Sequence, residues 1–319
     1  MCTAVSLTKG CHYFGRNLDF ENSFGEQVVV TPRNYPFGFA KTDHFAIIGV
    51  AMVKNGYPLY FDGVNEAGLG MAGLNFPGNA RYNEAKAGKE NIASFELIPR
   101  ILSTCDSVGA AKMALENINI TNHCFDKETH PSPLHWIIAD KNSAVTVEQT
   151  AEELKIYHNP VGVLTNNPTF DFHMTNLANY MSVSAGEAQN RFSDKVELTP
   201  HSRGMGGIGL PGDFSSVSRF VKASFVKLNC VCGETEQEKV NSFFRVLDGV
   251  SQPKGCVKTE NGDVMTHYSS CCNTDKGVYY YTTYFNRNIC AVDMHREKLD
   301  GEDLIRYDLQ SEQKFSWQN

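Results

Sequence analysis

The sequence lacks the segments that mark membrane, secreted and nucleic-acid-binding proteins. None of its 319 residues belongs to an apolar run of about 18 or more residues, the length that a membrane span needs. The first twenty residues contain neither the basic region nor the apolar region of a signal peptide. No basic block occurs, and the net charge is −7 with a pI near 5.8. We therefore expect a cytoplasmic protein that binds neither membranes nor nucleic acid.

Metal-binding and nucleotide-binding motifs are also missing. Ten cysteines are scattered along the chain, and the pairs at 230–232 and 271–272 lack the spacing of a zinc site. Residues 204–209 match the pattern GxGxxG, but Leu210-Pro211 stands where a nucleotide-binding helix should begin. We expect a loop at 204–209, free thiols without disulfides, and no metal or cofactor.

The chain has no repeat and no linker rich in proline, glycine or serine. Its length alone suggests about two domains. The composition, with 41% apolar and 20% charged residues, is ordinary for a globular protein. Because nothing in the composition marks a boundary, we expect one domain over residues 1–319.

The pattern of apolar residues predicts an α+β protein. A β-hairpin over 3–20 turns at Lys9-Gly10. Helical spacing occurs at 92–105 (with Pro99 as an internal flaw), 107–118, 171–183, 215–229 and 234–250. Further strands are predicted at 26–32, 45–53, 57–64, 69–76, 134–140, 144–150, 154–158, 161–166, 263–272, 277–284 and 288–295. Strands and helices come in runs rather than in βαβ alternation, which favours mostly antiparallel sheets with helices packed on them.

A cysteine directly follows the initiator methionine. Methionine aminopeptidase removes Met1 when the next side chain is small, and Cys2 would then carry both a thiol and a free α-amine. A thiolate is a strong nucleophile. An α-amine has a reference pKa of about 7.7–8.0 and can act as a general base near neutral pH. A small second residue also occurs by chance, so Cys2 alone does not establish catalysis.

Polar residues in three other segments fit the same chemistry. The hairpin lays Arg16 and Asp19 near the chain start, where an arginine favours a thiolate and an aspartate can hold a protonated amine. Asn75 and Asn166 each follow an apolar strand, where an amide can donate to a developing oxyanion. Each feature also has an ordinary interpretation, a solvated strand pair or a turn residue.

The motifs MCT, FGRNLD, DGVNEAGLGMAGLNFPG, VEQT, GVLTNNPTFD, GLPGDFSSVSRF and GVYYYTTY together resemble the choloylglycine hydrolase family. That family contains bile salt hydrolases and penicillin V acylases, and the resemblance covers nearly the whole chain. It implies an N-terminal nucleophile hydrolase fold, a four-layer αββα sandwich with two antiparallel sheets. It also implies hydrolysis of a C–N amide bond through an acyl-enzyme on a cysteine, and a homo-oligomer, a tetramer.

The resemblance implies a set of six catalytic residues: Cys2, Arg16, Asp19, Asn75, Asn166 and Arg219. The thiol is the nucleophile and its own amine the base, while Arg16 and Asp19 tune and orient them. Asn166 supplies the oxyanion-hole side chain, and Asn75 a backbone N–H and a substrate contact. Arg219 matches an arginine close to the thiol, although helical periodicity alone places it on the surface, opposite the stripe Val217, Phe220, Val221, Ser224, Phe225 and Leu228.

Asn75 also bears on the substrate, because penicillin V acylases typically have tyrosine at that position. The resemblance therefore favours glycine- or taurine-conjugated bile salts, small molecules that need an apolar cleft. Candidate walls are Leu18, Phe61 and Phe76, with the loop 120–133 as a cover, although apolar strand residues are usually core. A penicillin V acylase-type amidase remains an alternative. So does an inactive protein that binds amphipathic ligands, against which the joint presence of all six residues argues.

Overall fold

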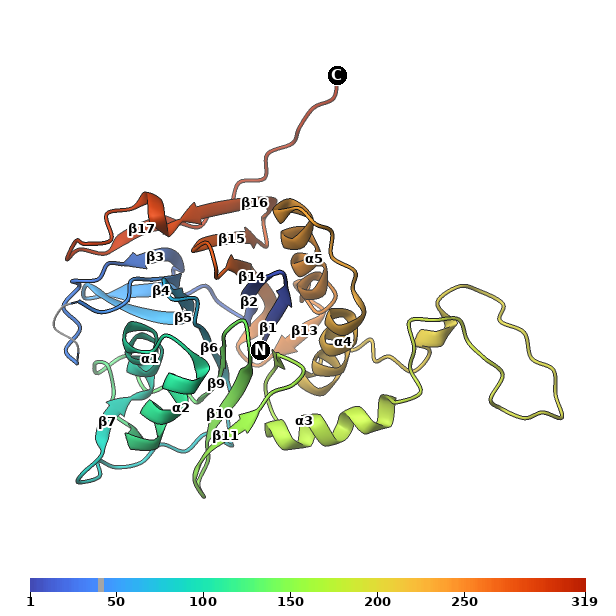
Figure 1. Ribbon diagram of the computed structural model, residues 1–319, viewed down its shortest axis with the longest axis horizontal. Helices are drawn as coiled ribbons and strands as arrows, with labels where there is room; N and C mark the ends of the chain where they lie inside the picture. Colours follow the sequence, from blue (N-terminus) through green and yellow to red (C-terminus); the bar gives the residue numbers. More distant parts are fainter. Residues whose placement is uncertain (40–42) are drawn as a thin grey trace.

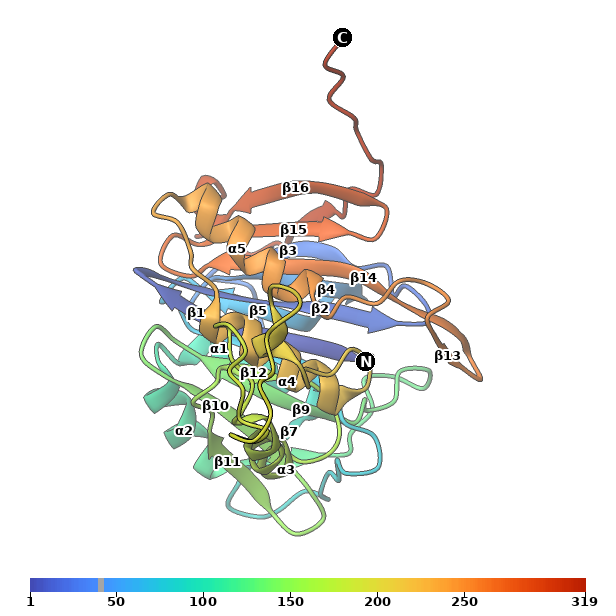
Figure 2. The same ribbon diagram turned by 90° about the vertical axis from the view of Figure 1, so that its right-hand side faces the viewer.

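The computed structural model describes residues 1–39 and 43–319. Two antiparallel β-sheets lie face to face at its centre, and helices cover their outer sides (Figures 1 and 2). This is the α+β sandwich that the sequence predicted. In the described residues, no helix is long and apolar enough to cross a membrane.

The first sheet begins with the hairpin at the chain start. β1 (Cys2–Lys9) and β2 (Cys11–Phe20) pair around Gly10, whose φ of 76° suits a residue without a side chain. The strand order is β12-β1-β2-β14-β15-β16, with β13 paired to β14. The remaining strands are β12 (Val163–Leu164), β13 (Val257–Thr259), β14 (Gly262–Asn273), β15 (Val278–Thr283) and β16 (Asn286–Asp293).

The second sheet has eight strands in the order β11-β10-β9-β6-β5-β4-β3-β17. It approaches the first sheet closely at Gly70, where a Cβ atom would lie 2.6 Å from the Phe14 ring, so a larger residue would push the sheets apart. The strands are β3 (Gln27–Thr31), β4 (Ile47–Lys54), β5 (Tyr57–Asn65), β6 (Gly70–Asn75), β9 (Leu134–Ala139), β10 (Ala144–Gln149), β11 (Leu154–His158) and β17 (Ile305–Asp308).

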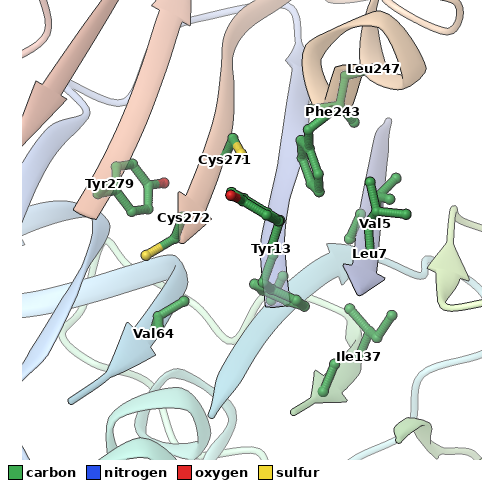
Figure 3. Close-up of a cluster of buried hydrophobic side chains, with 14 of the residues drawn as sticks. Val5, Leu7, Tyr13, Val64, Ile137, Phe243, Leu247, Cys271, Cys272 and Tyr279 are labelled. Carbon is green, nitrogen blue, oxygen red and sulfur yellow. The ribbon is translucent and has the colours of Figure 1, made fainter. Parts of the chain in front are cut away.

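Apolar side chains from both sheets and from the helix α5 (Glu236–Asp248) form the central core. Val5 and Tyr13 of the first sheet, Val64 and Ile137 of the second, and Phe243 of α5 are all buried in it (Figure 3). A second core lies between the other face of the eight-stranded sheet and the helices α1 and α2. The two layers of helix therefore cover opposite faces of the stacked sheets.

Five α-helices are present in the described residues, where the periodicity predicted them. Three begin at side-chain caps: Ser107 accepts from Ala110 N, Ser215 from Ser218 N, and Thr235 forms a capping box with Glu238. The helices are α1 (Leu97–Thr104), α2 (Val108–Asn117), α3 (Phe170–Leu177), α4 (Ser216–Asn229) and α5 (Glu236–Asp248).

Two predicted helices have different bounds in the structure. The helix predicted at 92–105 is in fact the end of β7 (Glu90–Ala93), a 3₁₀ turn, and α1. β7 pairs in parallel with β8 (Ile118–Thr121), a long-range pairing that helical spacing cannot reveal. Pro99 is harmless in α1 because it lies in the first turn, where no intrahelical N–H bond is lost. The helix predicted at 171–183 is shorter, since α3 ends at Leu177 and a 3₁₀ turn follows.

The face that α4 buries also differs from the one that helical periodicity alone indicates, and Arg219 lies near Cys2, as the family resemblance implied. Arg219 and Ala223 are buried, whereas Leu228 of the expected apolar stripe is 58% exposed. The helix packs on β1 and β12, and the face that meets these strands includes Arg219. An arginine can occupy this face because hydrogen-bond acceptors are present there, among them the Cys2 carbonyl and Asn166 Oδ1.

Candidate active site

The hairpin register places Cys2 beside two of the predicted site residues. Cys2 pairs with Leu18, and Ala4 two residues along pairs with Arg16, so these side chains share one face of the first sheet. That face points into the gap between the two sheets. Cys2, Arg16 and Asp19 are all buried, with Cys2 only 3% exposed.

Hydrogen bonds join Cys2 to segments that are far apart in the sequence. The Cys2 backbone N–H donates to Asn166 Oδ1 over 2.8 Å. Arg219 donates to the same Asn166 Oδ1 through Nη2 (2.7 Å), and through Nη1 to the Cys2 carbonyl. Asn166 Nδ2 donates in turn to the Asn75 carbonyl over 2.7 Å, which leaves its second hydrogen free for a ligand. We call Cys2, Arg16, Asn75, Asn166 and Arg219 the polar corner.

Arg16 is held by carbonyl groups of the second sheet. Its Nη1 donates to Phe61 O (2.9 Å) and to Gly73 O (2.6 Å), while Nη2 has no hydrogen-bond partner among the described residues. Burial acts to lower the pKa of Arg16, but the acidic groups around it, the Cys2 thiol foremost, raise it overall. The side chain is therefore a fixed cation with unused donor capacity beside the thiol.

Asp19 lies next to the chain start but points to a different set of partners. Its carboxylate accepts from Thr266 Oγ1 (2.6 Å) and from Gln252 Nε2 (3.2 Å). Its backbone N–H donates to the carbonyl of Met1 over 2.9 Å. Burial raises the pKa of Asp19, and the charges of Arg219 and the amino terminus oppose that rise. The Asp19 carboxyl group thus lies close to the amino end of the chain.

A cavity of about 600 Å³ opens beside the polar corner and is lined by Cys2, Arg16 and Asn75. Phe20, Phe24 and Phe61 pack along it with tilted rings, whose centroids lie 4.8 Å apart for Phe20 and Phe24 and 5.5 Å apart for Phe24 and Phe61. We call the apolar lining the apolar wall; it consists of Leu18, Phe20, Phe24, Met52, Leu59, Phe61, Phe95 and Ile98. A thiol at the edge of an apolar cavity suits attack on the polar group of an amphipathic molecule.

Two of the three predicted wall residues line this cavity. Leu18 and Phe61 do, but Phe76 does not. The Phe76 ring is fully buried and stacks on His135 at a centroid distance of 4.1 Å, so it belongs to the core behind the site. Phe76 follows the last residue of β6, where strand alternation no longer specifies which way a side chain points.

The loop predicted to cover the cleft contributes its last residues, 128–133, to the cavity lining. Lys54 anchors this loop, with Nζ 2.8 Å from Thr129 Oγ1 and 2.8 Å from the Asp126 carboxylate. Phe125 packs against Tyr57 and against a ring of the apolar wall, Phe95. The loop is thus held to the body of the protein by an ion pair and by aromatic contacts.

Several residues around the site carried no signal in the sequence. Thr3 Oγ1 accepts from Arg219 Nη1 over 2.8 Å, and Ser216 Oγ accepts from the Asn166 N–H over 2.8 Å. Short hydroxyl residues are common everywhere, so only the folded chain identifies these two. Within residues 1–39 and 43–319, no group of three or more His, Cys, Asp or Glu side chains could hold a metal ion. All ten cysteines, each in the described part of the chain, are free thiols.

Comparison with known proteins gives matches over the whole chain. The model of a family described as linear amide C–N hydrolases, choloylglycine hydrolase family, matches residues 2–307. A bile salt hydrolase/transferase from Lactiplantibacillus plantarum is 49% identical over 99% of both chains, and one from Clostridium perfringens is 38% identical over 96% of both.

Solved structures agree with these matches. The C2A mutant of a conjugated bile acid hydrolase from Clostridium perfringens has a TM-score of 0.92, with 35% identity and full coverage of both chains. A penicillin V acylase from Agrobacterium tumefaciens shares the fold, with a TM-score of 0.76, at 21% identity over 97% of this chain and 91% of that one.

Proposed function

The chain belongs to the choloylglycine hydrolase family of linear amide C–N hydrolases, and we propose that it hydrolyses glycine- or taurine-conjugated bile salts. One observation supports this most: a buried cysteine, bonded through its backbone to Asn166 and Arg219, lies at the edge of an apolar cavity of about 600 Å³. A rigid steroid acyl group fits such a wall, and the conjugated amide would lie at the polar corner.

The reaction begins once Met1 has been removed and Cys2 carries a free amine. The thiol proton passes to this α-amine, and the sulfur attacks the amide carbonyl carbon. The carbonyl oxygen becomes an oxyanion, which accepts from the free Nδ2 hydrogen of Asn166 and from the backbone N–H of Asn75. As the C–N bond breaks, the leaving nitrogen takes the proton, and the bile acid remains on Cys2 as a thioester. Water, deprotonated by the same amine, then attacks the thioester carbon. The C–S bond breaks, the free bile acid leaves, and the proton on the amine returns to the Cys2 sulfur.

Three further residues prepare this step. Arg16 offers its unpartnered Nη2 to the thiolate, and its positive charge favours the ionised sulfur. Arg219 fixes the Cys2 carbonyl and the Asn166 amide in one hydrogen-bond arrangement. Asp19 lies where its charge stabilises the protonated amine during attack.

The direct test is hydrolysis of taurocholate and glycocholate, followed by assay of the released amino acid. Penicillin V, run beside them, tests the acylase alternative. We expect kcat/KM to favour the bile salts, because Asn75 lies at the cavity edge where acylases typically have a tyrosine. A preference for penicillin V would change the substrate assignment but not the family. No turnover of any of these amides, with binding retained, would favour the inactive binding protein.

We also propose that the chain is a single domain that assembles into a homotetramer. Residues 181–213, which we call the arm, leave the body beyond α3 and project away from it (Figure 1). The exposed apolar side chains of the arm are Met181, Phe192, Val196, Leu198 and Ile208. Apolar side chains this far from the body have little to cover them within one chain, which supports contact with another copy.

Light scattering of the wild type and of a shortened arm tests this assembly. A bond from Ser184 N to Gly206 O closes the base of the arm, so residues 187–203 can be replaced by a short Gly–Ser linker. We expect an assembly of four chains for the wild type and of fewer chains for the shortened protein. If the wild type and the shortened protein contain the same number of chains, the arm is not part of the interface. Cell fractionation tests the proposed cytoplasmic location.

A further inference from the structure

Two buried histidines bind consecutive backbone carbonyls next to the proposed oxyanion donor. His135 Nε2 lies 2.8 Å from the Thr165 carbonyl oxygen, and His173 Nε2 lies 2.8 Å from that of Asn166. Both rings are fully buried. Neither histidine belongs to the reaction proposed above, which leaves these two polar groups without an assigned role.

The position of Asn166 explains why such contacts are needed. It lies beyond the end of β12, which pairs with β1 at only two residues, Val163 and Leu164. The sheet ladder therefore does not hold the Asn166 backbone. An oxyanion donor must be fixed in place before the reaction, and a displacement of about 1 Å can reduce the rate roughly 100-fold. Side chains must therefore fix the Asn166 backbone, because strand pairing does not.

His135 does so as part of a proton-sharing pair. A carbonyl oxygen can only accept, so Nε2 of His135 carries a hydrogen toward Thr165. Its other nitrogen, Nδ1, lies 3.0 Å from Glu148 Oε1, an oxygen that also accepts the Phe170 N–H over 3.0 Å. One hydrogen must lie between Nδ1 and Oε1, as an imidazolium facing a carboxylate or as a carboxylic acid facing a neutral ring. In either case the pair fixes the ring and the start of α3 together.

His173 works as a neutral single donor. Burial lowers the pKa of His173 to about 4, so its ring carries one hydrogen near neutral pH. That hydrogen is on Nε2, because Nε2 faces the Asn166 carbonyl and Nδ1 has no partner in the described residues. The ring stacks on Phe220 at a centroid distance of 4.7 Å, and Phe220 directly follows Arg219 in α4. His173 thus connects the Asn166 backbone to the helix that carries the arginine.

We propose that His135, His173 and Glu148 are positioning residues that hold the Thr165–Asn166 backbone, and with it the Asn166 amide, in the geometry of the polar corner. Ser216 completes the arrangement by accepting the Asn166 N–H. The proposal rests on the proposed function only in taking Asn166 as the oxyanion donor. It predicts that loss of either histidine's donor lowers kcat while substrate binding in the apolar cavity changes little.

The test compares two substitutions of His173. His173→Leu removes the donor, and His173→Gln keeps an amide N–H near the position of Nε2. We expect His173→Leu to lower kcat roughly 10- to 100-fold with KM within about twofold of the wild type, and His173→Gln to recover most of the loss. A Gln variant as slow as the Leu variant, although folded, would overturn the proposal.

His12 provides a matched control for burial alone. It is fully buried, its ring nitrogens lie 2.9 Å from the hydroxyl oxygens of Ser6 and Thr274, and burial lowers its pKa to about 4 as well. It pairs with Thr8 at the turn of the hairpin, the end opposite Cys2. We expect His12→Leu to lower the unfolding midpoint about as much as His173→Leu but to leave kcat unchanged. Equal kcat losses in both variants would reduce the role of His173 to general stability.

Hydrogen exchange separates this proposal from the proposed function. In peptides covering residues 163–170, exchange should be faster in His173→Leu than in the wild type, whether or not any bile salt is hydrolysed. Unchanged exchange there would contradict the proposal even if the enzyme assignment holds. If His173→Leu does not fold, Glu148→Gln serves instead. An amide nitrogen that donates to His135 Nδ1 leaves the Phe170 N–H without its acceptor, and an amide oxygen that accepts from both leaves a buried imidazolium without its carboxylate. The same local loosening is therefore expected in either case.

Discussion

The polar corner and the apolar wall border the same cavity but are built in opposite ways. In the corner, the single oxygen Asn166 Oδ1 accepts from two donors. The groups that these hydrogen bonds join come from β1, β6, α4 and the turn after β12. The wall is made of apolar side chains from β2 and the residues after it, β4, β5, the 3₁₀ turn before α1, and α1, which contact one another without directional bonds. Geometry in the corner is therefore specific, whereas the wall selects by shape and area.

This difference predicts how each region responds to substitution. Removing a directional bond in the corner leaves a buried polar group unpaired and disturbs the reacting atoms, so rates fall by orders of magnitude. Removing apolar area from the wall weakens ground-state and transition-state binding alike, so KM rises first. The experiments below test this distinction, from the largest expected effect to the smallest.

The largest effect is expected at Cys2 itself. Cys2→Ala removes the nucleophile and should abolish turnover, whereas Cys2→Ser should be greatly slowed, because a hydroxyl is a poorer nucleophile near neutral pH. Binding of a conjugated bile salt should persist in both, since the apolar wall is intact. Calorimetric titration beside an activity assay measures the two properties. Turnover by Cys2→Ala would place the nucleophile elsewhere.

Retention of the residue before Cys2 should be nearly as damaging. With Met1 in place the Cys2 nitrogen is a peptide N–H, which donates to Asn166 Oδ1 and cannot act as a base. A cleavable N-terminal extension that leaves Cys2 first after proteolysis allows the same preparation to be assayed before and after cleavage, with intact mass as the check. We expect activity only after cleavage. Full activity in the extended form would remove the amine from the mechanism.

Asn75→Tyr should change selectivity more than rate. Asn75 belongs to both regions, because its carbonyl accepts from Asn166 while the residue lines the cavity. A tyrosine keeps the backbone bond but narrows the cavity edge. We expect the ratio of kcat/KM for taurocholate over penicillin V to fall at least about tenfold, the size of a steric effect of 1–3 kcal/mol. An unchanged ratio would mean that selectivity resides in the wall or in the loop residues 128–133.

The wall itself is tested by a pair of phenylalanines. Phe61→Ala removes part of the cavity lining and should raise KM several-fold while kcat stays near the wild-type value. Phe76→Ala removes a fully buried ring that stacks on His135, and should lower the free energy of unfolding by about 3–5 kcal/mol. Denaturant titration and steady-state kinetics on both variants check the pair. A larger loss of stability in Phe61→Ala than in Phe76→Ala would contradict the assignment of Phe61 to the cavity lining and of Phe76 to the core.

The sequence predicted the α+β class, the hairpin at Gly10 and the positions of all five helices, because alternation and helical spacing are local properties. It did not predict β7, whose partner β8 is a long-range parallel strand. Burial of Arg219 could not be read from α4 either. Its acceptors, including Cys2 O and Asn166 Oδ1, come from distant segments that meet only in the folded chain. Cys2, Arg16, Asn75 and Asn166 carried local signals that also have ordinary interpretations, so resemblance to a family was needed to assign their roles. Arg219 was named by that resemblance alone.

The smallest effect expected is on stability in mild acid, and it separates the region behind the corner from an equally buried site elsewhere. Burial lowers the pKa of both His12 and His173 to about 4, against a reference near 6.5. Between these values the unfolded chain binds a proton at each histidine and the folded chain does not, so stability falls as the pH falls. Each should contribute about 2 kcal/mol of destabilisation between pH 7 and pH 5.

Burial also raises the pKa of Asp19 and Asp62, which opposes this trend, so the contributions of the histidines must be read from differences between variants. Urea titrations of wild type, His12→Gln and His173→Gln at both pH values should show a similar loss of pH dependence in each variant. Only His173→Leu, and not His12→Leu, should also lower kcat, because only His173 touches the Asn166 backbone.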